Sequence, residues 1–160
     1  MWEEYFTVVK KVEEKDPVKT KVIPCGCVSR DIAHSPAKVP HASVQVIPVR
    51  SSSGKIIMHQ RPDFKGFRTA VGKWDVLGGH VTFEMGVLSE NGLELASFET
   101  AVREAREEML VTFKNEAYLL EKKYFSPIGD IGQFECNDAT NAEYSTAFVL
   151  AIPENAIVST

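Results

Sequence analysis

Residues 97–110, "SFETAVREAREEML", decide the fold that the sequence predicts. Apolar residues recur in this stretch at spacings of three and four, which at about 100° per residue confines them to one stripe of a helix. Ser97 is suited to accept an orphan backbone N–H as the N-cap, and Glu99 stands in the first turn, where the helix dipole favours an acid. We therefore expect a helix over 97–110 whose apolar stripe packs on a sheet. The stripe consists of Phe98, Ala101, Val102, Ala105 and Met109.

Three glutamates gather on one flank of this helix. Glu104, Glu107 and Glu108 occupy an arc of about 100°, away from the centre of the apolar stripe. Arg103 can bridge Glu99 and Glu107, one turn to either side. The i,i+4 pair of Glu104 and Glu108 then keeps no cationic partner within the helix, and like charges at this spacing destabilise it. The flank is either a solvated face or a site for a hard divalent cation such as Mg²⁺, which prefers carboxylate oxygens.

Length and composition narrow the class of protein. A chain of 160 residues with 44% hydrophobic and 25% charged residues predicts a single domain over residues 1–160. The formal charge of −4 gives no long-range attraction to nucleic acid or to anionic lipid. No apolar run is long enough to span a bilayer, and the N-terminal acids are unlike a secretory signal, so we expect a cytoplasmic protein. Cys25, Cys27 and Cys136 form no C-x-x-C pair and predict reduced, partly buried thiols.

The rest of the chain predicts mostly strands. We expect an opening strand or hairpin at 5–12 and a hairpin of 42–49 with 55–61, in which Gly54 takes a positive φ. A short strand over 74–81 is expected to end on paired glycines, and residues 29–41 are expected to form an ordered loop. Further strands are expected within 116–127 and 145–153. Strands with one strong helix predict an α/β (α+β) fold.

The glycines and the helix together resemble the Nudix box. Gly78 and Gly79 follow a Trp-Asp pair, and after a gap residues 103–108 supply Arg-Glu-x-x-Glu-Glu in order. The resemblance implies a Nudix fold, a mixed β-sheet sandwiched between helices (α/β/α sandwich). It also implies that Mg²⁺ or Mn²⁺ is held against a diphosphate, with Arg103 orienting the acids. The implied metal ligands are the Gly78 carbonyl, Glu104, Glu107 and Glu108.

The chain departs from the box at three points. The stretch "EMGVLSENGL", 84–93, resembles an insertion of ten residues between the glycines and the arginine. Leu95 stands where the box has its first glutamate, and either Glu84 or Glu94 is a candidate to replace it. Leu110 replaces the glycine that commonly follows the Glu-Glu pair.

A wider resemblance points to Nudix proteins similar to isopentenyl-diphosphate isomerase. It covers roughly residues 4 to 153 and is carried by "SRDIAH", "PHASVQVIPV", "SGKIIMHQR", "KWDVLGGHV" and "NAEYSTAFVL". The position that matches the isomerase's catalytic cysteine is Gly78, which carries no thiol. We therefore favour a hydrolase. An isomerase-like enzyme and a non-catalytic Nudix-like binding or regulatory module remain the alternatives.

Other side chains are candidates for the same site. Glu143 precedes a strong strand, and the resemblance implies a fourth acidic metal ligand or a general base, although a charged strand end has the same appearance. His80 lies next to the glycines and is either near the metals or packed behind them. His34 and His41 hydrogen-bond either a substrate or the backbone. Four cations are either phosphate ligands or solvated loop residues: Arg61, Lys65, Arg68 and Lys73.

The resulting hypothesis is metal-assisted hydrolysis of the diphosphate linkage in a nucleoside diphosphate joined to another moiety. The expected catalytic residues are Arg103, Glu107, Glu108 and Glu143. The expected substrate is a small molecule, nucleic acid and membranes are not expected as partners, and a homodimer is possible. In the family a further strand and helix commonly follow "IPENAIVST", so the resemblance implies that the chain is a fragment or that a partner covers the far face of the sheet.

Overall fold

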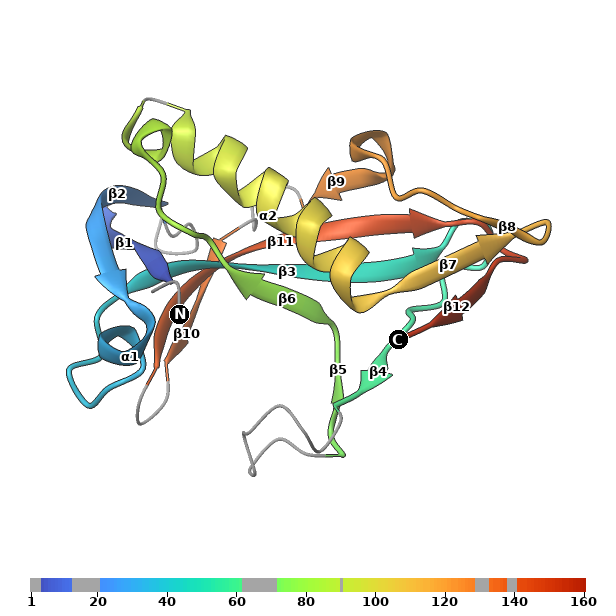
Figure 1. Cartoon of the computed structure of the whole chain (residues 1–160), viewed down its shortest axis with the longest axis horizontal. Coiled ribbons are helices and arrows are strands. Elements are labelled where there is room, and N and C mark those ends of the chain that lie inside the picture. Colours follow the sequence, from blue (N-terminus) through green and yellow to red (C-terminus); the bar gives the residue numbers. More distant parts are fainter. Residues whose placement is uncertain (1–3, 13–20, 62–71, 90, 129–132, 138–140) are drawn as a thin grey trace.

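The main sheet of the protein is mixed. The computed structural model describes residues 4–12, 21–61, 72–89, 91–128, 133–137 and 141–160 (Figure 1). The order of the strands is β10-β11-β3-β1-β2, with β6 also paired to β3 and β9 to β11. Strands β3 and β11 run parallel, and every other pair in this sheet is antiparallel. The seven strands are β1 Tyr5–Val12, β2 Lys21–Ser29, β3 His41–Arg50, β6 Leu77–His80, β9 Phe125–Pro127, β10 Gln133–Asn137 and β11 Ala142–Ile152.

The core lies between the central pair of strands and one long helix. Val44 and Val46 of β3 and Leu150 and Ile152 of β11 are all fully or almost fully buried. Helix α2, Gly92–Glu108, crosses the face of the sheet on which these side chains lie (Figure 1). Alternate residues of each strand point to this face, where they pack against the apolar stripe of the helix. The α+β class that we expected is confirmed.

Helix α2 begins five residues before its expected start. Ser97 is 1% exposed and lies inside the helix, so its assignment as the N-cap is wrong. Asn91 precedes the helix, and Leu93 extends the buried face toward the N-terminus. Of the segment that resembles an insertion, 84–93, the last two residues belong to the helix and Met85–Leu88 form a 3₁₀ turn. The expected stripe is confirmed, with Met109 buried although the helix ends at Glu108.

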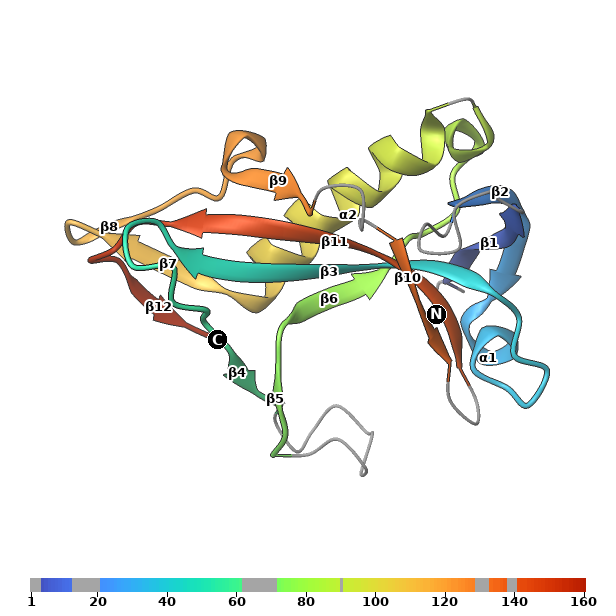
Figure 2. The same cartoon turned by 180° about the vertical axis from the view of Figure 1, so that it is seen from behind.

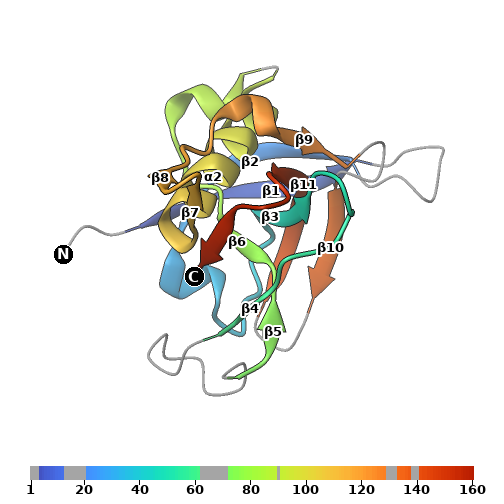
Figure 3. The ribbon, with the colours of Figure 1, turned by 90° about the vertical axis from the view of Figure 1, so that its right-hand side faces the viewer.

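The expected hairpin of 42–49 with 55–61 forms only near its turn. Gly54 has φ +68°, as expected, but the returning chain makes one isolated bridge, between Ile56 and Val49. Strand β4, His59–Gln60, pairs instead with β5, Trp74–Asp75. These two strands form a ribbon that extends from the sheet on the side away from α2 (Figures 1 and 3).

Residues 116–127 do not form one strand. They divide into β8, Glu116–Ala117, a 3₁₀ turn at Lys122–Tyr124, and β9. Strand β8 joins β7, Leu110–Phe113, and β12, Ile157–Ser159, in a separate sheet. The positive φ angles of Lys114 and Asn115 form the tight turn between β7 and β8.

Among the described residues there are two α-helices, and they differ greatly in length. Helix α1, Arg30–Ala33, has four residues and lies in the segment that was expected to be a loop. Viewed from behind, β3 and β11 pass in front of α2, and no helix of the described residues crosses them (Figure 2). A second layer of helices is therefore not part of the described structure. Neither helix has the length and apolar character needed to cross a bilayer.

Candidate active site

A cavity of about 180 Å³ lies where β6, β11, the end of α2 and the β4–β5 ribbon meet. Five of the residues singled out in the sequence line it: Arg61, Gly78, His80, Glu108 and Glu143. Gly79, His59, Asp75 and Gln45 complete its polar wall. Among the five candidates, Arg61 and Glu143 are the farthest apart in sequence, at 82 positions.

Neighbouring atoms lie too close to Gly78 and Gly79 for either residue to carry a side chain. A Cβ at Gly78 would lie 2.7 Å from the carbonyl oxygen of Val44 on the neighbouring strand. A Cβ at Gly79 would strike the carboxylate of Glu104. Both glycines lie within β6 rather than at the end of a strand as expected. Glycine therefore lets the helix bring its acids against the strand, and it leaves no room for a side chain at position 78.

Glu104 is the glutamate that this close approach buries. Its side chain is 13% exposed, and Nη2 of Arg103 lies 2.7 Å from Glu104 Oε1. Burial raises the pKa of Glu104, the Arg103 guanidinium lowers it, and the carboxylates of Glu107 and Glu108 raise it further. The expectation that Glu104 has no cationic partner is wrong, because the adjacent Arg103 turns back onto it.

The other two glutamates of the flank point to different places. Glu107 is 58% exposed and accepts from Nη1 of Arg103 at 3.3 Å. Glu108 lines the cavity. Glu99 pairs with Lys122 rather than with Arg103, so the expected double bridge forms only on the Glu107 side. Of the three acids of the flank, only Glu108 faces the cavity.

Glu143 is a largely buried carboxylate, 17% exposed, whose surroundings favour its ionised form. Glu143 is the second residue of β11, and His80 Nε2 lies 3.3 Å from Glu143 Oε1. The amide of Asn141 donates to the same oxygen. Burial would raise the pKa of Glu143, but these hydrogen bonds, the charge of His80 and a hydrogen bond from Ser43 lower it to about 2. Glu143 thus presents a full negative charge to the cavity.

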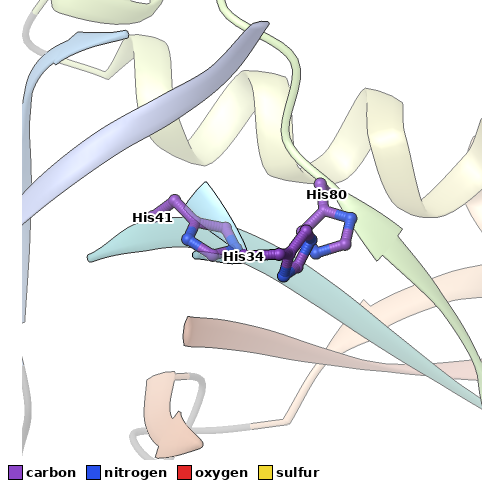
Figure 4. A group of neighbouring side chains, drawn as sticks. All are labelled: His34, His41 and His80. Atoms are coloured by element: carbon purple, nitrogen blue, oxygen red, sulfur yellow. The ribbon is translucent and has the colours of Figure 1, made fainter. Parts of the chain in front are cut away.

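Three histidines meet beside Glu143. His34 follows α1, His41 begins β3 and His80 ends β6, and one ring nitrogen of each lies within 4.8 Å of the others (Figure 4). The ring of Phe6 stacks on His80 at a centroid distance of 4.1 Å. Their position was not expected from the sequence, in which each histidine was considered alone. We call His34, His41 and His80 the histidine cluster.

The histidine cluster is suited to bind a metal ion. Burial lowers the pKa of His41, although its hydrogen bond to the Val39 carbonyl acts in the opposite direction. Burial and the neighbouring histidines likewise lower the pKa of His34. His41 Nδ1 donates to the Val39 carbonyl at 2.8 Å, which leaves Nε2 with a free lone pair. Neutral imidazoles fixed in this way are the usual form of a metal-binding histidine.

Buried polar atoms without a partner occur both at the cavity and in the histidine cluster. Four buried side-chain nitrogen or oxygen atoms have no hydrogen-bond partner among the described residues: His34 Nε2, His41 Nε2, His59 Nδ1 and Asn141 Oδ1. His59 lines the cavity, Asn141 bonds to Glu143, and the other two belong to the histidine cluster. Each such atom costs about 1–3 kcal/mol if it stays unpaired. The cavity wall at His59 and the histidine cluster are therefore the two places that a ligand or an ion would complete.

The remaining candidate cations divide between the cavity and its surroundings. Arg61 lines the cavity, and its Nη1 donates to Asp75 at 3.0 Å. Lys73 is exposed and does not line the cavity, and its carbonyl accepts from the Arg61 backbone. Lys65 and Arg68 lie outside the described residues.

Neither candidate for the missing first glutamate reaches the cavity. Glu84 lines a second cavity of about 820 Å³, which also contains Leu95 and Arg103. Glu94 is exposed in the first turn of α2. The structure therefore gives neither of them a role beside Glu108.

The thiols do not join the site. Cys25 and Cys27 are free and exposed on β2, so the expectation that they are partly buried is wrong. Exposed residues alternate along β2, so Cys25 and Cys27 lie on the face of the strand that the core does not cover. The side chain of Cys136 lies outside what the structure describes.

Comparison with known proteins found no family model and no curated protein that matches the chain. The candidate site is therefore defined by its geometry. The cavity wall carries Glu108, Glu143 and His80 from the helix and the main sheet, and His59, Arg61 and Asp75 from the ribbon. Two acids and a guanidinium in one cavity suit a ligand with bound cations and phosphate oxygens.

Proposed function

We propose that the protein is a metal-dependent hydrolase of the Nudix type that cleaves the diphosphate linkage of a nucleoside diphosphate joined to another moiety. One observation carries the proposal: Glu108 from the helix, Glu143 from β11 and Arg61 from the ribbon line one cavity across the glycine strand. Carboxylates bind the divalent cations that accompany phosphates, and a guanidinium binds phosphate oxygens. The Nudix α/β/α sandwich, with a second layer of helices, belongs to this proposal, as does a cytoplasmic location.

The residues at the site fit two kinds of metal ion. Glu108 and Glu143, with the Gly78 carbonyl, suit Mg²⁺ or Mn²⁺, which prefer oxygen ligands. The histidine cluster suits Zn²⁺ or another first-row transition ion, which imidazole binds well. A divalent cation at this site would neutralise diphosphate charge and lower the pKa of a bound water.

The protein's own residues then have distinct tasks. Glu143, ionised and fixed by His80 and Asn141, is placed to ligate a cation or to accept the proton of the attacking water. Arg103 positions Glu104 against Gly79 through its ion pair. Glu107 lies outside the cavity in this geometry, and its role as a metal ligand stays a prediction from the Nudix resemblance.

Isomerisation of isopentenyl diphosphate is the competing activity. Position 78 lacks the thiol of that enzyme, and the Val44 carbonyl occupies the space that a Cβ would need. We therefore expect no interconversion of isopentenyl and dimethylallyl diphosphates. Formation of either isomer from the other by the wild type, together with its loss in Glu143→Gln, would favour the isomerase.

A substrate screen with a matched pair of variants tests the hydrolase. The purified protein is assayed with Mg²⁺ or Mn²⁺ on dinucleoside polyphosphates, sugar nucleotides and oxidised nucleoside triphosphates, and released phosphate groups are measured. We expect metal-dependent turnover that Glu108→Gln lowers by about 10² or more. Glu99→Gln is the control, because Glu99 lies on the same helix and pairs with Lys122 away from the cavity. Turnover that is equal in all three proteins, or absent with every substrate, contradicts the proposal and favours a binding module.

A further inference from the structure

The two faces of the β4–β5 ribbon differ in chemistry. Side chains alternate along a strand, and His59 stands directly opposite Asp75 in the pairing of β4 with β5. His59, Arg61 and Asp75 line the cavity. Met58 and Trp74 are 45% and 66% exposed and do not line it. The ribbon therefore presents one polar face to the cavity and one apolar face to its surroundings.

The ribbon holds its polar face in a defined position. The Arg61 backbone N–H donates to the Lys73 carbonyl at 3.0 Å, and the Gly72 N–H donates to the Arg61 carbonyl at 3.0 Å. The side-chain amide of Gln60 donates to the Gly72 carbonyl at 2.8 Å. These bonds cross-link the two strands on the side of the His59–Asp75 pair that leads toward the turn. The imidazole of His59 thus stands on a fixed backbone beside the Arg61 guanidinium.

His59 is the one member of this polar face with a buried atom that lacks a partner. Arg61 donates to Asp75, and Asp75 also accepts from the Val76 backbone at 2.9 Å. His59 Nδ1 is buried and has no hydrogen-bond partner among the described residues. A buried imidazole nitrogen at a cavity wall is costly unless a ligand supplies the missing partner.

We propose that His59 binds a phosphate group of the ligand, together with Arg61, in the cavity that Glu143 also lines. The inference rests on the proposed function only for the reaction that follows binding. The binding of phosphate by His59 does not depend on hydrolysis. The imidazole N–H donates to an anionic phosphate oxygen, and the Arg61 guanidinium lies beside it to share the charge. The volume of about 180 Å³ is smaller than the roughly 300 Å³ at which ordinary ligand pockets begin. The cavity thus takes the diphosphate, and the organic part of the ligand lies outside it.

Binding of inorganic pyrophosphate tests this without any catalysis. Calorimetric titration with pyrophosphate and Mn²⁺ is performed on the whole chain and on His59→Phe, which keeps the ring but removes both nitrogens. We expect the dissociation constant to rise by about tenfold or more, as for a lost hydrogen bond to a charged group. His59→Asn, whose amide reaches the region of Nδ1, is expected to retain affinity within about threefold of wild type.

Met58→Ala is the control from the adjacent position, because Met58 is exposed and does not line the cavity. Its affinity for pyrophosphate is expected to equal that of wild type, and thermal unfolding without pyrophosphate confirms that each variant is folded. Equal affinity of wild type and His59→Phe overturns the inference. Equal weakening by Phe and Asn also overturns it, because the effect is then structural. Absence of pyrophosphate binding to wild type overturns it as well.

Kinetics separate this inference from the proposed hydrolase. If a substrate is found, His59→Phe is expected to raise KM by about tenfold and to change kcat by less than about threefold, the pattern of lost uniform binding. If no substrate is hydrolysed while pyrophosphate binding still depends on His59, the proposed function fails and the inference stands. If hydrolysis occurs and neither KM nor pyrophosphate binding responds to His59→Phe, the inference alone fails.

Discussion

The acidic end of α2 and the histidine cluster differ in how far their polar groups are exposed to solvent and paired with other residues. On α2, Glu107 is exposed and Arg103 partly neutralises both Glu104 and Glu107. In the histidine cluster the rings of His41 and His80 stack on Phe6, His41 is fully buried, and two ring nitrogens have no partner among the described residues. Exposed ion pairs contribute at most about 1 kcal/mol to stability, whereas each unpaired buried polar atom costs about 1–3 kcal/mol. The helix end is therefore stable without a ligand, and the histidine cluster gains most from one.

The largest expected effect follows from a change where the two regions meet, at Glu143. Glu143→Gln should lower kcat by about 10² to 10⁴ with little loss of substrate affinity, because it removes the ionised group while its size is kept. Steady-state kinetics across a Mg²⁺ titration measures this. A residue that is only a charged strand end would shift the free energy of unfolding by no more than about 0.5 kcal/mol. Unchanged kcat at every metal concentration would remove Glu143 from the site.

The acidic end itself can be divided by two matched variants. Glu108→Gln should lower kcat by about 10², because Glu108 lines the cavity. Glu107→Gln should change kcat by less than about threefold if the geometry described here persists with substrate, because Glu107 is exposed and paired with Arg103. Equal losses of about 10² in both variants would show that Glu107 turns inward to bind metal, as the Nudix resemblance implies.

Metal should stabilise the protein through the histidine cluster. Addition of Zn²⁺ at about 100 times its dissociation constant should raise the free energy of unfolding of chelator-treated protein by about 2.7 kcal/mol. His34→Phe should abolish most of this gain, whereas Glu107→Gln should retain it. Thermal unfolding with and without Zn²⁺ measures both variants. An equal Zn²⁺ effect in wild type and His34→Phe would show that the ion binds elsewhere.

The smallest expected effect is the pH dependence of the metal-free protein. Burial lowers the pKa of both His34 and His41 below the ordinary value of 6.5, so below that pH the unfolded chain binds more protons than the folded chain. The free energy of unfolding should therefore fall as the pH is lowered from about 7.5 to 5.5, by at most about 1.4 kcal/mol per pH unit and histidine.

Urea unfolding at several pH values tests this slope, and His34→Phe should reduce it. Glu143 contributes in a different range, because its pKa is about 2 in the folded protein and ordinarily 4.5. Its stabilisation is complete above about pH 4.5 and is lost between about 4.5 and 2. A stability that is constant between pH 7.5 and 5.5 would indicate that the two histidines titrate normally.

Local patterns predicted those parts of the molecule whose partners are near in sequence. The stripe of Ala101, Val102 and Ala105 was readable because helical period alone defines a buried face. The start of α2 was not, because Ser97 was assigned as the N-cap and Gly92 and Leu93 to a loop insertion, whereas the helix already begins at Gly92. The role of Arg103 was only partly readable, since helix geometry permits several pairings and the burial of Glu104 beside Gly79 selects one of them.

The site needed contacts that no local pattern contains. His41 and His80 are brought together because β6 pairs with β3, and Glu143 joins them because β11 pairs with the other edge of β3. The individual candidates Glu143 and His80 were identified in the sequence, but their hydrogen bond was not. His59 gave no signal at all, because it lies in a run that was expected to pair with β3 and pairs with β5 instead.

The parallel pairing of β3 with β11 has a consequence for the synthesis of the protein. Ser43 and Ser145, whose side chains bond to each other across this pair, are separated by 102 positions. At about 5–20 residues per second, a ribosome needs about 5 to 20 s to make the intervening chain. During that time one edge of β3, with its run of Val44, Val46 and Ile47, has no strand to pair with, and unpaired apolar edges promote aggregation. The yield of folded protein should therefore depend on temperature and on chaperones during expression.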